Sequence, residues 1–178
     1  GTGSNPYTLS GLTGNTSYDF YVQADCGADS SAWVGPFAFT TLCNTIVSFP
    51  FFEGFEDASI TRPCWYPEHK TGSSDWTYST GSNGGSVTTA FSGSKNAVFV
   101  SMSGTNSPIT SLVSPVLDLT SLSIPRLTFY YAQETWAPDQ NYTRVLYKTS
   151  GAGSWTVIWA DSTSVTSWTQ VVLTLPNP

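Results

Sequence analysis

The sequence predicts an all-β protein, and three observations favour this class. Ser, Thr, Gly and Asn dominate the polar positions and aromatic residues make up 15% of the 178 residues, a composition typical of strands and tight turns. The segment SYDFYVQADC, residues 17–26, alternates apolar and polar side chains, as a strand with one buried face does. Turn signals separate the later apolar segments at roughly the ten-residue spacing of an antiparallel sandwich.

The first part of the chain is expected to form three short strands, at residues 7–12, 17–26 and 35–42. Three strands make a poor independent domain, because nothing covers the apolar side chains of their inner face. The strands that should cover Tyr18 and Phe20 are missing from this stretch, and the chain opens without a recognisable signal peptide. We therefore expect the N-terminus to be a cut through a longer protein.

Beyond Cys43, the segment FPFFEGFED, residues 49–57, is expected to be a strand with four phenylalanines and three carboxylates. Charged residues make up only 10% of the chain, so three carboxylates here call for an explanation. Either they form the polar edge of a core strand or they bind a ligand. The segment 64–81, CWYPEHKTGSSDWTYSTG, is expected to form polar loops. Further strands are expected at residues 96–102, 107–120, 125–134, 143–150, 154–161 and 167–176.

Charge and hydropathy exclude two classes of partner. The net charge is −6 with only six Lys and Arg residues, too few to neutralise many phosphates, so nucleic acid is not an expected partner. No stretch reaches the roughly 18 consecutive apolar residues of a membrane span, so no membrane insertion is expected.

The three cysteines favour one disulfide. Cys26 and Cys43 fall at opposite ends of neighbouring strands, roughly 25 Å apart by the rise per residue, whereas a disulfide needs Cα atoms within about 7 Å. Cys43–Cys64 is therefore the preferred pair, and Cys26 either pairs outside this segment or stays free. Three reduced, buried thiols are the alternative. One histidine and no CxxC pair argue against a structural zinc site.

The stretch LTGNTSYDFYVQADC…WVGPFAFTT resembles the C-terminal half of a fibronectin type III domain, which would occupy residues 1–43. Leu12, Thr16 and Tyr18 have the spacing of that family's tyrosine corner, in which the hydroxyl returns to the backbone near the preceding turn. The resemblance implies a partial sandwich, of which the first half is absent.

Residues 44–178 resemble the MAM-like, choice-of-anchor J and cleaved-adhesin jelly rolls of secreted multidomain proteins of Bacteroidota. The motifs that carry the resemblance are FPFFEGFE, PCW (63–65), SGSKNAVFV (92–100), LVSPVLDLT (112–120), RLTFYY (126–131), GSWTVIW (153–159) and WTQVVLTLP (168–176). The resemblance implies a jelly-roll β-sandwich that lacks its last strand. It also implies neighbouring domains in the same chain, a secreted or cell-surface location and export by the type IX route of Bacteroidota.

The resemblance further implies one structural calcium ion near the start of the jelly roll. Calcium takes six to eight oxygen ligands from carboxylates, amides and carbonyls. The positions that match are Glu53 and Glu56, with Asp57 adjacent and Asn96 able to bring an amide oxygen; Asp75 is a weaker candidate. The alternative is a polar rim held by ordinary hydrogen bonds.

Enzymatic activity is not expected, and no residue is assigned a catalytic role. His69 is expected in a solvated loop, and the GxSxG nucleophile motif is absent. On a strand, Glu53 and Asp57 would lie about 13 Å apart, beyond the roughly 5 to 9.5 Å that separates the carboxyls of glycosidases. A more distant partner such as Glu134 or Asp139 is left open.

The loop QETWAPDQNYTR, residues 133–144, has the chemistry of a sugar-binding surface. Such surfaces stack pyranose faces on exposed aromatic rings and bind hydroxyls with polar side chains. The candidate residues in this loop are Trp136, Asp139, Gln140, Asn141, Tyr142 and Arg144, and a second candidate loop offers Trp65 and Tyr66. The alternative for Trp65, Trp76, Trp155 and Trp168 is that they fill the core.

Two functions stay open at this point. The first is a non-catalytic adhesion or carbohydrate-binding module whose partner is a glycan or a host or surface protein. The second is a structural spacer in a surface filament, or an ancillary domain of an exported hydrolase or protease. An exposed Trp136 favours the first function, and a buried Trp136 favours the second.

Overall fold

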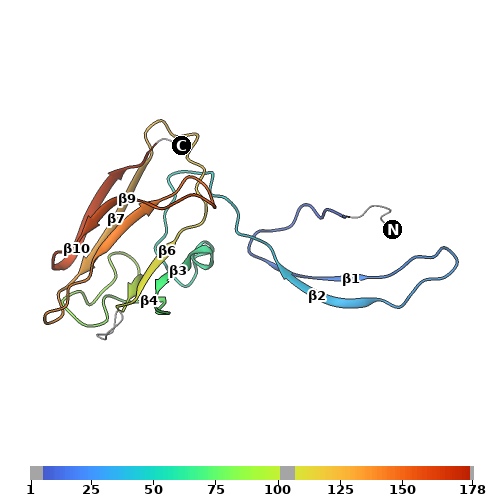
Figure 1. The fold of residues 1–178 in the computed structure, drawn as a ribbon, viewed down its shortest axis with the longest axis horizontal. Coiled ribbons are helices and arrows are strands. Elements are labelled where there is room, and N and C mark those ends of the chain that lie inside the picture. Colours follow the sequence, from blue (N-terminus) through green and yellow to red (C-terminus); the bar gives the residue numbers. More distant parts are fainter. Residues whose placement is uncertain (1–5, 101–106, 177–178) are drawn as a thin grey trace. The chain divides into compact units, whose positions relative to one another are not determined.

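The computed structural model describes residues 6–100 and 107–176. The chain divides into two compact units, Gly1–Thr45 (unit 1) and Ile46–Pro178 (unit 2) (Figure 1). Within the described ranges, ten strands pair into five antiparallel two-stranded sheets, and the one helical element is the 3-10 turn η1, Arg62–Cys64. The all-β class is confirmed, whereas the domain types implied for residues 1–43 and 44–178 stay a prediction.

Unit 1 contains an antiparallel hairpin in which β1, Ser17–Val22, pairs with β2, Val34–Thr40. The alternating pattern places aromatic side chains opposite one another on one face of the pair. Phe20 lies opposite Phe37, with ring centroids 5.2 Å apart. No described residue of unit 1 is buried, so this aromatic face is open.

The hydroxyl of Tyr18 accepts a hydrogen bond from the backbone N–H of Thr13 at 2.9 Å. This is the contact that the tyrosine-corner spacing predicts. The segment 7–12, in contrast, is not a strand, which corrects the prediction. Gly11 has a φ of 75°, a left-handed conformation that breaks the extended backbone just before this turn.

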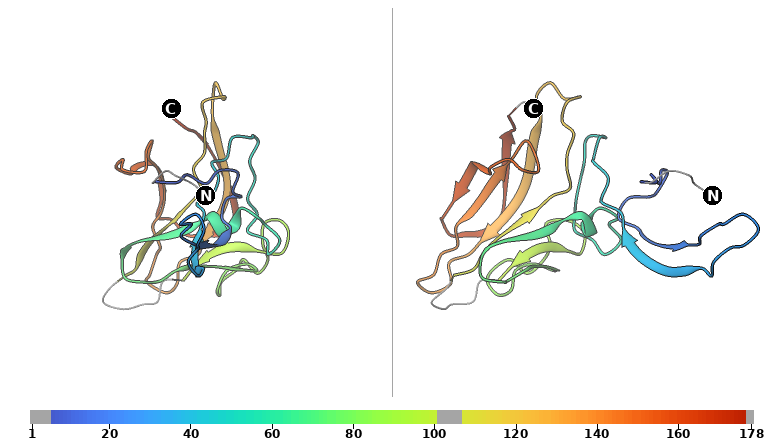
Figure 2. Two further views of the ribbon diagram at one scale, coloured as in Figure 1. Left: turned by 90° about the vertical axis from the view of Figure 1, so that its right-hand side faces the viewer. Right: turned by 45° about the vertical axis from the view of Figure 1, so that its right-hand side comes forward.

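Unit 2 carries eight strands in its described part, arranged in four antiparallel pairs. The pairs are β3 (Tyr66–Thr71) with β6 (Ile109–Val113), β4 (Trp76–Ser79) with β5 (Asn96–Phe99), β7 (Arg126–Gln133) with β10 (Val165–Thr174), and β8 (Thr143–Tyr147) with β9 (Thr156–Asp161). The strands β3 to β6 gather on one side of the unit, and β7, β9 and β10 gather on the other (Figures 1 and 2).

Several expected strands of unit 2 are shorter than predicted. The strand expected over 107–120 extends only over Ile109–Val113, because a proline two residues later cannot donate to the ladder. The strand expected over 96–102 is β5, Asn96–Phe99, and residues 101–102 lie outside the described residues.

The segment 49–57 is not a strand, which is a second correction. The Glu53 carboxylate accepts a hydrogen bond from the Phe55 N–H at 2.6 Å, and Phe55 has a φ of 60°. The backbone therefore bonds to a nearby side chain and turns, instead of pairing with another strand. The Phe55 ring packs edge-on against Trp65 at 5.1 Å and stacks on Tyr78 at 5.4 Å.

The segment 64–81, expected to be loops, contains β3 and β4, which is a third correction. Tyr66 pairs with Val113 of β6, and Trp76 pairs with Phe99 of β5. The polar sequence hides these strands because their stability comes from the partner strand rather than from intrinsic propensity. His69 consequently lies in β3, with its Nε2 atom 2.8 Å from Oδ1 of Asp75.

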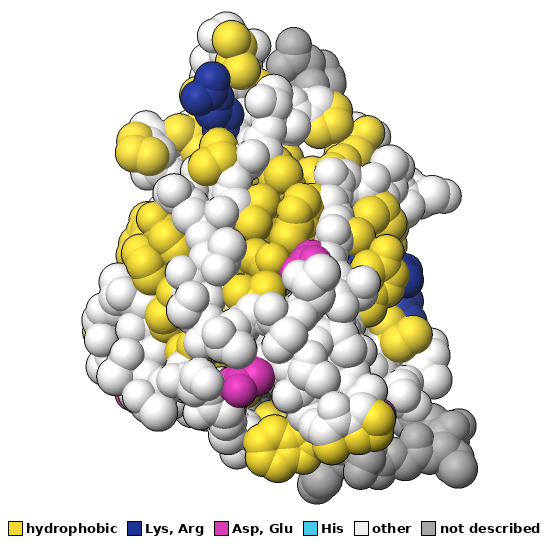
Figure 3. Space-filling view, turned by 90° about the vertical axis from the view of Figure 1, so that its left-hand side faces the viewer, with side chains coloured by type: hydrophobic (Ala, Val, Ile, Leu, Met, Phe, Trp, Pro, Cys, Tyr) yellow, Lys and Arg dark blue, Asp and Glu magenta, His cyan; other side chains and the backbone are white. Residues whose placement is uncertain are grey.

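Several half-buried aromatic side chains of unit 2 pack against one another, whereas the buried hydrophobic residues of the described part are Val98 and Val113. Trp159 packs edge-on against Phe129 at 5.3 Å and against Tyr131 at 4.9 Å. The four tryptophans expected in the core, Trp65, Trp76, Trp155 and Trp168, are each half-buried. Apolar side chains nevertheless remain visible in the middle of the face of unit 2 shown in Figure 3.

A buried polar network joins β7, β8 and β9. The Gln133 side chain, 6% exposed, donates to the Asp161 carboxylate at 3.1 Å and accepts from the Thr143 hydroxyl. The Tyr131 hydroxyl donates to the same carboxylate at 2.8 Å. Burial, followed by this hydrogen bond, raises the pKa of Tyr131 to about 12, while the same bond holds the pKa of Asp161 below its usual value.

This network is expected to shape the pH dependence of stability. Because the folded pKa of Asp161 lies below its unfolded value, its contribution is present above about pH 4 and is lost as the pH falls through the folded pKa. The contribution of Tyr131 is complete below about pH 10 and is lost as the pH rises towards 12. Urea unfolding from pH 3 to 11 measures both the loss of stability at acid pH (the acid limb) and the loss at alkaline pH (the alkaline limb).

Two variants separate these limbs. Asp161→Asn is expected to weaken the acid limb while keeping an alkaline limb, since burial of Tyr131 remains. Tyr131→Phe is expected to remove the alkaline loss. An unchanged acid limb in Asp161→Asn would show that other carboxylates dominate acid unfolding.

The predicted disulfide between Cys43 and Cys64 is confirmed. Cys26 is a free, exposed cysteine. The alternative of three buried, reduced thiols is therefore wrong.

Candidate functional site

A tight turn presents Trp136 in the loop between β7 and β8. The backbones of Trp136 and Asp139 exchange two hydrogen bonds, each 2.9 Å long. Ala137 has a φ of 52° and is followed by Pro138, whose φ is negative by its ring. A positive φ followed by a negative φ is the pattern of a type II′ turn, which sharply reverses the chain. The Trp136 side chain leaves from the first residue of this turn.

The Trp136 side chain is 68% exposed, yet one edge of its ring is supported. A Cβ atom added to Gly84 would lie 3.3 Å from Cζ3 of the Trp136 ring, so the glycine backbone approaches the indole closely. Gly84 has a φ of 92°, which a residue with a side chain rarely adopts. The glycine loop thus contacts one edge of the indole, and the rest of the ring is exposed to solvent.

Glu134 fastens this glycine loop to the end of β7. Its carboxylate accepts hydrogen bonds from the backbone N–H and the hydroxyl of Ser86. A Cβ atom on Gly85 would lie 2.6 Å from Oε2 of Glu134, so a side chain there would require the carboxylate to shift. Sequence reasoning missed this support, although the run of turn residues GSNGGS (81–86) signals a loop of unusual backbone conformation.

Tyr142 and Arg144 form a second exposed feature of the same loop. Tyr142 is 54% exposed, and the Cζ atom of Arg144 lies 4.1 Å from the centre of its ring. Tyr142 lies just before β8 and Arg144 is its second residue, and the guanidinium lies over the ring. The Cα atom of Tyr142 lies within about 11 Å of that of Asp139, because three residues of chain span no more.

The remaining candidates of this loop divide into a scaffold residue and two exposed ones. Gln140 accepts a hydrogen bond from the Thr135 hydroxyl and donates to the Asn141 carbonyl at 3.2 Å, so it closes the loop. Asp139 and Asn141 are exposed. The structure therefore brings polar groups beside both aromatic side chains.

Of the two aromatic candidates in the second loop, Trp65 and Tyr66, only Tyr66 is exposed to solvent. The Trp65 ring packs against Phe55, and its Nε1 atom is buried without a hydrogen-bond partner. Tyr66 is 47% exposed at the start of β3.

The carboxylates proposed for calcium are each bonded within the protein. Besides the Phe55 N–H, Glu53 accepts hydrogen bonds from the hydroxyls of Ser59 at 2.8 Å and Thr61 at 2.6 Å. Glu56 accepts from the backbone N–H groups of Ser94 at 2.8 Å and Lys95 at 3.0 Å. The Ser94 hydroxyl, followed by the Lys95 N–H, lowers the pKa of Glu56.

Asp57 and Asn96 are also engaged. The Arg62 guanidinium lies 2.7 Å from the Asp57 carboxylate and lowers its pKa, with a smaller contribution from Lys95. The amide oxygen of Asn96 accepts from the Gly81 N–H at 2.8 Å. A cation at these residues would have to displace such donors. No group of three or more His, Cys, Asp or Glu side chains gathers for a metal ion within residues 6–100 and 107–176, and calcium stays a prediction.

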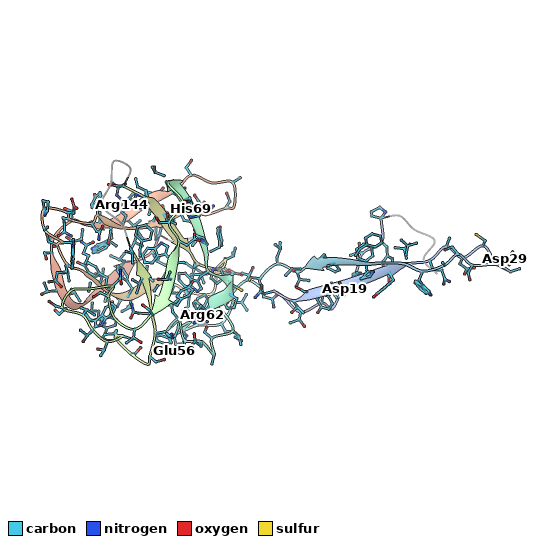
Figure 4. The ribbon with its side chains drawn as sticks, turned by 90° about the horizontal axis from the view of Figure 1, so that it is seen from below. Asp19, Asp29, Glu56, Arg62, His69 and Arg144 are labelled. Atoms are coloured by element: carbon cyan, nitrogen blue, oxygen red, sulfur yellow. The ribbon has the colours of Figure 1, made fainter. Side chains whose placement is uncertain are left out.

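The aromatic loop and the carboxylate cluster are separate sites. Figure 4 shows Arg144 on the opposite side of unit 2 from Arg62 and Glu56. Among the residues that the structure describes, no helix is long and apolar enough to cross a membrane.

Comparisons with protein-family models, with curated proteins and with solved structures find no match to this chain. The fold and the site therefore define its class: an all-β protein that presents a supported, exposed aromatic loop.

Proposed function

We propose that this chain is a non-catalytic carbohydrate-binding or adhesion module, whose glycan stacks on Trp136. The observation that carries the proposal is the exposure of this one indole. All six tryptophans of unit 2 lie in the described ranges, and the other five are half-buried. Three of those five donate their indole N–H to protein acceptors: Trp76 to Thr110, Trp155 to Glu68 and Trp168 to Thr89.

An exposed indole on a rigid turn is suited to binding a sugar ring. Stacking removes apolar surface from water on both partners, and the fixed turn limits the loss of side-chain entropy. Asp139 and Asn141 would supply acceptors and donors for hydroxyl groups beside the ring.

The resemblance noted in the sequence extends this proposal to location. We propose a secreted or cell-surface module, with the C-terminal half of a fibronectin type III domain preceding a MAM-like jelly roll. The Tyr18–Thr13 hydrogen bond supports the first assignment. The Cys43–Cys64 disulfide supports an oxidising, extracellular environment.

The Trp136→Ala variant tests the function directly. We expect it to lose at least about tenfold in affinity for the glycan that the wild type selects from a panel of polysaccharides and glycoproteins, because central aromatic anchors carry most of the binding energy. Isothermal titration calorimetry measures the loss. Trp33→Ala is the matched control, since Trp33 is 65% exposed but belongs to unit 1.

Equal losses in the two variants would indicate nonspecific adhesion to exposed tryptophans. A wild-type chain that binds nothing in the panel would instead favour the structural spacer.

A further inference from the structure

We propose that the glycan is acidic, and that Arg144 binds the carboxylate of a uronic-acid unit next to the sugar stacked on Trp136. This inference rests on the proposed function and names the ligand class of the same site. It starts from the charges of unit 2 and from the contacts of its guanidinium groups.

Most cations of this chain already have partners. All six Lys and Arg residues lie in the described ranges. Arg62, Lys70 and Lys95 pair with carboxylates, and Lys148 lies over the Trp155 ring and donates to the Gly151 carbonyl. Within those ranges, Lys148, Arg126 and Arg144 have no carboxylate within 4.0 Å, and Arg126 and Arg144 are the two guanidinium groups among these three cations.

Arg144 differs from Arg126 because an aromatic ring orients it. With its Cζ atom 4.1 Å from the centre of the Tyr142 ring, the guanidinium is restricted by the stack. Stacking occupies the face of the guanidinium and leaves its N–H groups directed outward from its edge. That fork matches the two oxygens of a carboxylate, and its orientation lowers the entropy lost on binding.

Asp139 gives the ligand a direction. An acidic sugar would be repelled by Asp139 and attracted by Arg144. The carboxylate of the sugar is therefore placed at Arg144, and hydroxyl groups are placed at Asp139. Because the chain carries a net charge of −6, an acidic sugar depends on Arg144 for local charge compensation, which a neutral sugar does not need.

The test compares oligogalacturonate with its methyl ester, in which each carboxyl group loses its charge and gains one methyl group. We expect the wild type to bind oligogalacturonate at least about tenfold more tightly than the ester, with the preference falling as salt increases. Arg144→Gln is expected to abolish this preference, so that the variant binds the two ligands with equal affinity. Arg144→Lys is expected to keep part of it, because lysine supplies the charge without the planar fork.

Arg126→Gln is the matched control, because it removes the other guanidinium that has no carboxylate partner. This variant is expected to keep the preference. Circular dichroism of each variant verifies that it is folded. Equal binding of both ligands by the wild type, or a preference that survives in Arg144→Gln, would overturn the inference while Trp136-dependent binding keeps the proposed function. Arg144-dependent binding confined to sulfated saccharides would overturn the assignment to carboxylates. A wild type that binds no saccharide would overturn the proposed function and the inference together.

Discussion

Replacing Cys43 and Cys64 together with serine is expected to lower the free energy of unfolding by about 3 kcal/mol. The disulfide closes a loop of about twenty residues that contains the whole segment 49–57. Without the bond, the unfolded chain regains the entropy that the closed loop denies it. The segment is not paired in a sheet, and it is held in the folded state by side-chain contacts such as those of Glu53 and Phe55.

Urea unfolding followed by tryptophan fluorescence measures this loss. Cys26→Ser is the control and is expected to change stability by less than about 0.5 kcal/mol, since Cys26 is free and exposed. The double variant should resemble wild type treated with a reductant. If reduction has no effect on the midpoint, the loop is held by its packing and not by the disulfide.

Glu53→Ala is expected to cost about 2–3 kcal/mol. Its half-buried carboxylate satisfies three donors, the Phe55 N–H and the hydroxyls of Ser59 and Thr61. Alanine removes the acceptor of all three, and only one of the two hydroxyls can donate to the other instead. A part-buried donor without a partner costs more than an average hydrogen bond contributes. Glu53→Gln should cost less, because it keeps one carbonyl oxygen and a hydroxyl can turn to accept from the amide.

The neighbouring variant Phe52→Ala serves as the control for Glu53. Phe52 is 77% exposed, so its loss is expected to change stability by less than about 0.5 kcal/mol. Thermal melting with calcium and with a chelator adds the test of the metal. If protein donors alone satisfy Glu53, the wild type melts at the same temperature in both. A melting temperature that rises with calcium in wild type, and not in Glu53→Ala, would instead support the cation.

The candidate site shows where prediction from sequence stopped. The residues of the loop 133–144 were identified from their chemistry, since exposed aromatic and polar side chains in a loop are unusual enough to be noticed. Whether Trp136 faces solvent could not be predicted, because Gly84 approaches it from a loop about fifty residues earlier in the chain. The role of Glu134 was missed for the same reason, since its partner Ser86 belongs to that loop.

By itself, the sequence determined those features that depend on residues close together in the chain or on their spacing. The alternation of residues 17–26 predicted β1, the Tyr18 spacing predicted its hydrogen bond to Thr13, and cysteine spacing predicted Cys43–Cys64. These features depend on side-chain periodicity and on distances along a strand. Both can be read from the order of the residues in the sequence.

Only the tertiary structure decided the strands and contacts that distant segments create. β3 and β4 exist because β6 and β5 pair with them, although β3 is mostly polar and both lie in a segment rich in turn residues. The segment 49–57 failed to become a strand because Glu53 bonds locally, despite an apolar sequence that favours one. In the first case the distant partner strands outweigh a weak intrinsic strand propensity. In the second case the Glu53 carboxylate competes for the backbone N–H and outweighs a favourable one. Strand propensities differ by only about 1 kcal/mol, so either effect can decide the structure.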